Sequence, residues 1–247
     1  MKRNVILALV CMMVLASCNI DKVINMGNGL RIEPSRTIVR KEYKQKDFDK
    51  LVVDVVANVK FIQSKDGDFR VVLSCPDNYV ELFKFEVENR ELQVEFTRDN
   101  VNIEAKNVDV TVYSPVLREL DNSGVASVEI DKLVADKLEV ENSGVGSLYL
   151  SGLTIGRLEA DCSGVGSIEL KGMAERAVLD CSGVGSIKAE GLKAKSVKAD
   201  VSGVGGINCY ASERIDGEVS GVGSLKFGGK PQEKQLRRDG VGDISEL

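Results

Sequence analysis

Histidine and tryptophan are both absent from this 247-residue chain, and aromatic residues make up only 5% of it. Without histidine, the Ser-His and Cys-His pairs that activate nucleophiles in hydrolases are excluded. The sequence also lacks a Cys-x-x-Cys motif, which together with the missing histidine argues against a zinc site. No basic run stands out and the formal charge is −5, so nucleic acid is not expected as a partner.

A short phrase, Ser-Gly-Val-Gly-Ser with close variants, recurs in the second half of the chain at intervals of 18 to 20 residues. The seven copies begin at Ser123, Ser143, Ser163, Ser182, Ser202, Ser220 and Asp239. A short fixed period is typical of proteins built from stacked repeats, because one unit cannot bury its apolar face alone. Repeats of this length therefore predict a solenoid.

Apolar and polar residues alternate on both sides of each Ser-Gly corner, as at Leu138 and Val140 before the second copy and Leu148 and Leu150 after it. A period of two predicts strands, and a unit of about 20 residues is too short for a propeller blade. We therefore expect an all-β fold, a parallel β-helix of about seven coils of 18–20 residues. Each coil is predicted to have two strands and two corners, with glycines such as Gly152 marking the second corner.

Equivalent positions in successive coils should form ladders along the rod. The inward ladder just before the Ser-Gly corner comprises Asn122, Asn142, Cys162, Cys181, Val201 and Val219. The two asparagines are expected to bond each other and the corner backbone, since a buried amide must be paired. The two cysteines are predicted to be stacked thiols, because a ladder points both side chains the same way; a disulfide is the alternative.

An outward ladder of carboxylates runs beside the inward one, which we call the acidic ladder. It comprises Asp121, Glu141, Asp161, Asp180, Asp200 and Glu218. The plain interpretation is a solvated acidic edge that discourages sideways aggregation. The functional alternative is a weak Ca²⁺-binding stripe or a docking face for a basic partner.

The N-terminus resembles a bacterial lipoprotein leader. Lys2 and Arg3 precede an apolar stretch at 5–14, and Leu-Ala-Ser-Cys ends at Cys18. The apolar stretch is too short to span a membrane, so residues 1–17 are predicted to be a signal peptide, cleaved before Cys18. Acylation of Cys18 would anchor the chain to a membrane, and an incidental Cys18 after an ordinary signal peptide is the alternative. Because Asn19 rather than Asp follows, we expect an outer-membrane lipoprotein, on the cell surface or the periplasmic face.

Three segments follow the leader: a lipidated tether at 18–36, a strand-rich part at 37–116 and the β-helix repeats at 117–247. The strand-rich part holds most of the aromatic residues, with hairpin turns predicted at 65–68 and 88–90 and a helical turn at 79–83. It is expected to cap the open edge of the first coil. The last coil, 236–247, carries extra charges that resemble a polar cap, and pairing of this end with a second copy is an open alternative.

Two signatures carry a family resemblance: Phe48-x-x-Leu51, and a run of alternating valines at 108–112 that leads through Pro115 and Leu117 to Leu120 and the first Ser-Gly. With the Ser-Gly-x-Gly-Ser coils, residues 37–230 resemble the "putative auto-transporter adhesin, head GIN domain" family. The resemblance implies a right-handed β-helix-like solenoid on a secreted or lipid-anchored protein of Gram-negative bacteria. It implies adhesion, and it brings no catalytic residues.

We expect an adhesin-like binding module for a glycan or protein, without a cofactor other than the weak Ca²⁺ just considered. Tyr149 and Tyr210 are the only aromatic residues of the middle coils and are the candidates for stacking on a sugar ring. One alternative is a non-binding envelope spacer. Another is a carbohydrate-active β-helix enzyme, a polysaccharide lyase or hydrolase, but a uniform carboxylate ladder does not single out a catalytic acid.

Overall fold

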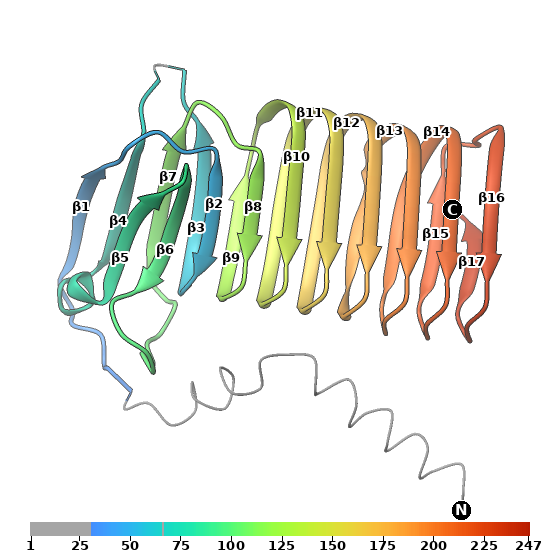
Figure 1. Cartoon of the computed structure of the whole chain (residues 1–247). Helices are drawn as coiled ribbons and strands as arrows, with labels where there is room; N and C mark the ends of the chain where they lie inside the picture. The colour runs from blue at the N-terminus through green and yellow to red at the C-terminus, as the bar shows by residue number, and fades with distance from the viewer. Residues whose placement is uncertain (1–30, 66) are drawn as a thin grey trace, which may run out of the picture.

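Parallel strands stack into a β-solenoid of about six turns, close to the seven coils predicted (Figure 1). This computed structural model describes residues 31–65 and 67–247. The predictions for the signal peptide at 1–17, for Cys18 and for most of the tether lie outside the described residues. No helix in the described ranges is long and apolar enough to cross a membrane.

The N-terminal part contains seven strands and one short 3-10 helix. They are β1 (Ile38–Lys44), β2 (Lys50–Asp54), β3 (Val56–Gln63), β4 (Arg70–Pro76), η1 (Asp77–Leu82), β5 (Phe83–Glu88), β6 (Glu91–Phe96) and β7 (Asp109–Ser114). The coils that follow are formed by β8 (Glu119–Asn122), β9 (Val125–Ile130), β10 (Leu133–Asn142), β11 (Val145–Cys162), β12 (Val165–Cys181), β13 (Val184–Val201), β14 (Gly206–Val219), β15 (Ser224–Gly228), β16 (Glu233–Arg238) and β17 (Asp243–Glu246).

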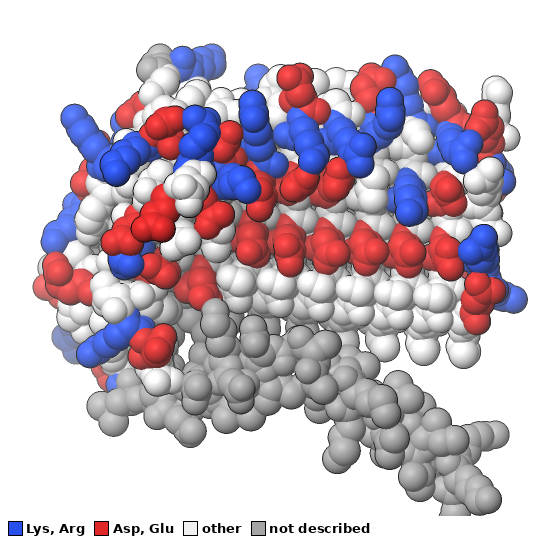
Figure 2. Space-filling view, in the orientation of Figure 1, with Lys and Arg blue, Asp and Glu red and all other residues white. Residues whose placement is uncertain are grey.

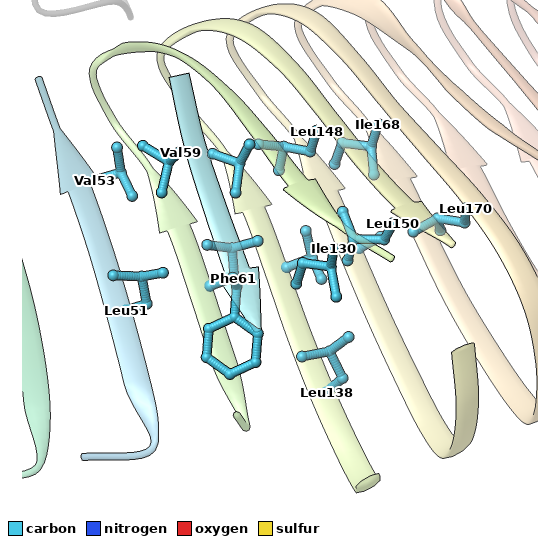
Figure 3. Close-up of a cluster of buried hydrophobic side chains, with 14 of the residues drawn as sticks. Leu51, Val53, Val59, Phe61, Ile130, Leu138, Leu148, Leu150, Ile168 and Leu170 are labelled. Atoms are coloured by element: carbon cyan, nitrogen blue, oxygen red, sulfur yellow. The ribbon is translucent and has the colours of Figure 1, made fainter. Parts of the chain in front are cut away.

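Neighbouring coils are in register, so that equivalent residues of the repeat lie side by side. Leu148 of β11 pairs with Ile168 of β12, which pairs with Ile187 of β13. These inward side chains, together with the adjacent row of Leu150 and Leu170, form a continuous apolar core along the rod (Figure 3). The predicted alternation is therefore confirmed as the pattern that fills the coil.

Each coil has three sides rather than the two predicted. In β11 the buried residues form three groups, Leu148 with Leu150, Leu153 with Ile155, and Leu158 through Cys162, and two outward residues separate each group from the next. The short middle side was not predicted, because no loop in the sequence marks where it begins and ends. The chain turns at Gly152 and Gly156 within the single strand β11, with a small register shift between neighbouring coils.

The Ser-Gly corner needs glycine because the backbones of successive coils approach closely there. A Cβ built on Gly166 would lie 1.8 Å from the carbonyl oxygen of Gly146, and one on Gly164 would lie 2.2 Å from that of Gly144. These glycines do not have positive φ angles, whereas Gly152 at the second corner does, at +57°. Close approach therefore selects glycine at the first corner, and backbone conformation selects it at the second.

The inward ladder before the corner has the predicted contacts. Asn122 donates from Nδ2 to Oδ1 of Asn142 at 2.8 Å, and Asn142 donates to the carbonyl oxygen of Gly146 at 3.3 Å. Both amides are fully buried. Cys162 and Cys181 are paired in register and are free, buried thiols, as predicted.

Parallel stacking continues into the N-terminal part. β2 pairs with β6 and β8, and β3 pairs with β7 and β9, so two further layers lie beneath the first Ser-Gly coil. The predicted hairpin at 88–90 is confirmed by the antiparallel β5–β6 pair. The predicted helical turn at 79–83 is confirmed by η1, except at Phe83, which is the first residue of β5. The prediction of a hairpin at 65–68 was wrong, because the next strand, β4, lies antiparallel to β1 and β7, whereas β3 pairs in parallel with β7 and β9.

A buried carboxylate joins this N-terminal part to the first coil. Asp49 is 6% exposed, and its Oδ2 lies 3.3 Å from Arg90 and 3.7 Å from Arg118. The backbone carbonyl of Asp49 accepts a hydrogen bond from the amide of Arg118. A buried charge with two cationic neighbours is expensive to break, so it fixes the position of the cap on the rod.

Candidate functional site

A groove runs along the short middle side of the coils and has a volume of about 820 Å³. Its outward side chains come from four successive coils, in the register Val134, Thr154, Met173 and Lys193. Val134 and Met173 are 53% and 58% exposed, which makes them two of the more exposed large apolar side chains of the described chain. The groove is therefore an apolar hollow that is open to solvent and long in the direction of the rod axis.

The charged residues of the groove are mainly cationic. Four cations line it, namely Arg118, Lys137, Lys193 and Lys195, against two carboxylates, Asp136 and Glu175. Lys137 pairs in register with Arg157, and Arg157 pairs with Arg176, so one cation lies on each of three successive coils. We call these three residues the basic row; Lys137 lines the groove, and the two arginines lie beside it. In Figure 2, Lys and Arg gather along one edge of the visible face, above a straight row of Asp and Glu.

The cations of this surface differ in their partners. Lys195 forms an ion pair with Glu175 at 2.6 Å, and Arg157 forms one with Glu159 at 2.7 Å. Within residues 31–65 and 67–247, Arg176 and Lys193 have no carboxylate at ion-pair distance; Lys193 instead lies over the ring of Tyr210, 3.8 Å from its centroid. Exposed ion pairs contribute little, so the paired cations too can exchange a carboxylate for a ligand anion.

The two tyrosines predicted to face a ligand do not share a site. Tyr210 belongs to the corner beside the groove, through its contact with Lys193. Tyr149 projects from a different side of the coil, 45% exposed and paired in register with Glu129 and Glu169. Three coils separate the two tyrosines, about 14 Å along the axis. Only Tyr210 is thus placed beside the groove.

The acidic ladder lies on the same long side of the coil as the basic row. Its six carboxylates are in register from β8 to β14, and the ladder ends where Glu218 meets Arg237 of β16 at 3.6 Å. A shallow hollow of about 230 Å³ lies over its first four members and the glutamates beside them. Their position confirms the ladder as a structural feature, and its role stays a prediction.

Burial alters the acidity of this ladder. Desolvation, with repulsion from Glu141 and Glu119, raises the pKa of Asp121 to about 6. Desolvation also raises the pKa of Glu141, Asp161 and Asp180, with smaller contributions from neighbouring carboxylates in the case of Glu141 and Asp180. Most of these side chains are half-buried between outward rows, so the predicted solvated acidic edge is only partly exposed to water.

The described residues contain no cluster of three or more acidic or cysteine side chains arranged to hold one metal ion. Carboxylates stacked about 4.8 Å apart form a line, whereas Ca²⁺ takes six to eight oxygen ligands around it. This geometry gives no support to the weak Ca²⁺ stripe, which stays a prediction.

The groove was not predicted, although the sequence contains a signal for it. Val134 and Met173 are apolar at an outward position, where neighbouring outward residues are polar. They do not align when coils are compared by the distance from the corner glycine, because the register shifts between Leu150 and Leu153. Alignment on the buried residues, such as Ile155 with Ala174, would have placed Met173 in one row with Thr154 and Val134.

Comparisons with known proteins agree with this architecture. Residues 47–231 match the model of the family described as "Putative auto-transporter adhesin, head GIN domain". The crystal structure of a putative adhesin from Bacteroides fragilis NCTC 9343 is 37% identical, with a TM-score of 0.84, over 87% of this chain and 100% of that one. A putative adhesin from Parabacteroides distasonis ATCC 8503 is 23% identical, with a TM-score of 0.71, over 88% and 100%.

A further structure, described as a putative lipid binding protein from Parabacteroides distasonis ATCC 8503, is 22% identical with a TM-score of 0.68, over 88% of this chain and 100% of that one. At this identity, as at 23%, the likeness shows the fold alone. No curated protein matches the chain. Because the family model covers most of the described residues, and the Bacteroides structure agrees in fold and sequence, the chain belongs to the "Putative auto-transporter adhesin, head GIN domain" family.

Proposed function

We propose that this chain is a lipid-anchored protein of the outer membrane whose solenoid binds an extended glycan or protein segment in the groove. The observation that carries the proposal is the groove itself, an apolar hollow of about 820 Å³ that crosses four coils. Ligand sites are typically concave and apolar, with a few polar groups that fix the ligand. The family description, "Putative auto-transporter adhesin, head GIN domain", supports a binding role.

The arrangement of the groove favours an extended ligand over a small molecule. Its lining positions repeat once per coil, so contacts recur at intervals of about 4.8 Å along the axis. A chain-like ligand can use such contacts in sequence, and solenoids commonly bind their partners along an extended surface in this way.

The first experiment locates the protein. Cells that express the full chain are treated with protease, with lysed cells as the control. Cleavage on intact cells is expected if the solenoid is displayed outside. Replacing Cys18 by Ala should release the protein from the membrane fraction, because the acyl anchor is then lost.

The second experiment tests the groove. Purified full-length protein is applied to a panel of glycans and extracellular matrix proteins, and two double variants are compared. Val134→Glu with Met173→Glu should abolish capture of whichever ligand is bound. Val145→Glu with Val184→Glu, which adds the same charge at exposed valines of the Ser-Gly corner, should leave it unchanged. Equal loss in both variants would place binding elsewhere, and no capture together with full protease protection would favour the spacer.

A further inference from the structure

The charge of the groove has a sign opposite to that of the whole protein. Four cations and two carboxylates line it, while the chain carries a formal charge of −5. A cationic groove on a protein of negative net charge attracts anions to one place, while the remaining surface repels them. Complementary charge of this kind sets which partners are accepted.

The spacing of the cations matches a polymer rather than a single anion. The basic row places one cation on each of three successive coils, about 4.8 Å apart. Arg118 and Lys195 extend the cationic lining to the coils at either end of the groove. A ligand that carries anions at regular intervals along its length can meet several of these cations at once.

The floor of the groove points to sugar rather than to nucleic acid. Single-stranded nucleic acids are held by aromatic side chains on which bases stack, and Tyr210, at the corner beside the groove, is not one of its lining residues. The apolar lining of the groove includes Val134, Met173 and small residues such as Ala135 and Ala174. Aliphatic side chains of this kind pack against the C–H faces of sugar rings, which removes apolar surface from water.

The acidic ladder defines the limit of the surface. It runs parallel to the basic row on the same side of the coil, with Glu139 and Glu159 between them. A polyanion that moved across the coil would meet these carboxylates, so repulsion keeps it aligned with the rod axis. The arrangement therefore selects both the charge and the direction of the ligand.

We infer that the groove binds an anionic polysaccharide, a carboxylated or sulfated glycan laid along the rod. This inference rests on the proposed binding function and specifies its ligand class. Among the cations of the groove and the basic row, Lys193 and Arg176 have no carboxylate partner in the described residues, and they make the first contacts with the glycan anions. Lys195 also contacts the glycan when a glycan anion replaces Glu175 as its ion-pair partner.

The test uses the full chain in detergent micelles and fluorescently labelled polygalacturonate, with neutral dextran, poly-glutamate and single-stranded oligo-dT as competitors. We expect polygalacturonate to bind, dextran to leave binding unchanged, and affinity to fall as salt rises. Dextran sulfate in place of polygalacturonate separates sulfate from carboxylate recognition.

Two double variants separate the groove from net charge. Arg176→Glu with Lys193→Glu should weaken binding by at least about tenfold, since each loses an attraction and adds a repulsion. Lys188→Glu with Lys226→Glu makes the same charge change at exposed positions on another side of the coil and should change affinity by less than about twofold.

Results other than these would contradict the groove as the site, the glycan as the ligand or its negative charge. Equal weakening in both variants would mean attraction by overall charge and would overturn the groove as the anionic site. Tighter binding of poly-glutamate or oligo-dT would overturn the glycan. Groove-dependent binding of a neutral glycan alone would overturn the anionic class and leave the proposed function standing, whereas absence of any groove-dependent ligand would remove both.

Discussion

Asn142 is the residue on which the buried amide pair depends. It accepts a hydrogen bond from Asn122 and donates one to the corner carbonyl of Gly146, and no water-accessible surface remains on either amide. Other coils place Val201 or Val219 at this ladder position, so the core also accepts an apolar side chain there. The asparagines thus replace apolar packing by one hydrogen bond between them, and the buried Nδ2 of Asn122 requires Asn142 as its acceptor.

Replacing Asn142 by Val should lower the free energy of unfolding by about 2–3 kcal/mol, because the amide of Asn122 is then buried without a partner. The double variant Asn122→Val with Asn142→Val should return to within about 1 kcal/mol of the wild type. Urea denaturation of the three proteins checks this. A double variant less stable than the single one would contradict the pairing.

Asp121 gives a pH-dependent prediction. Its pKa of about 6 in the folded chain lies above the value of about 4 expected when unfolded, so the folded state binds the proton more tightly. Its contribution to stability is most favourable below pH 4 and is lost as pH rises through 6. The carboxylates of Glu141, Glu119, Asp54 and Glu91 around it act in the same direction.

Asp121→Asn should therefore raise stability at pH 7.5 by about 1 kcal/mol, after allowance for solvent screening of a half-exposed group. The gain should shrink at pH 5, where Asp121 is largely protonated. Thermal unfolding at both pH values measures the difference. Glu190→Gln removes the same charge from an exposed corner and should change the unfolding temperature little at either pH.

Among the elements, the Ser-Gly corner is the most constrained. Gly166→Ala should destabilise the protein by about 3 kcal/mol or more, because its Cβ would lie 1.8 Å from a backbone oxygen that the adjacent coil holds in place. Gly228→Ala is the matched control, since its Cβ would meet only ordinary contacts at 3.8 Å and beyond. Comparison of their unfolding temperatures tests whether close coil approach is the cause, and similar losses in the two variants would contradict it.

The sequence predicted the structure best at positions where a single physical cause determines the residue type. Period-two alternation predicted the strands, and the repeated glycines predicted the corner, because steric exclusion acts through the same atoms in every coil. The asparagine pair and the stacked thiols followed from the ladder. The middle side and its groove did not, since Met173 falls into the row of Val134 and Thr154 only after a register shift that counting from the corner glycine does not reveal. The partners of β4 were missed for a similar reason, as long-range pairing is not encoded by a local turn.

For the whole molecule, nearest-neighbour stacking predicts tolerance to the loss of a complete coil. Deleting residues 163–181 removes one complete coil. It joins Cys162 to Ser182, and this junction is equivalent to Cys181–Ser182 in the intact chain. The shortened protein should fold, retain its β circular-dichroism spectrum and melt a few degrees lower. Deleting only 163–171 removes part of a coil, puts inward residues outward and should prevent folding. If both deletions behave alike, the coil is not the unit of stability.

Because the coils stack closely, the chain gains ordered surface but loses most of the length that it would have if extended. About 20 residues of extended chain could span roughly 65–70 Å, but wound into one coil they lengthen the rod by about 4.8 Å. The same residues instead present three outward-facing sides at fixed positions. A chain whose task was only to hold something away from the membrane would achieve far more reach by remaining extended, whereas this winding holds the outward residues of every coil in ordered, laterally accessible rows.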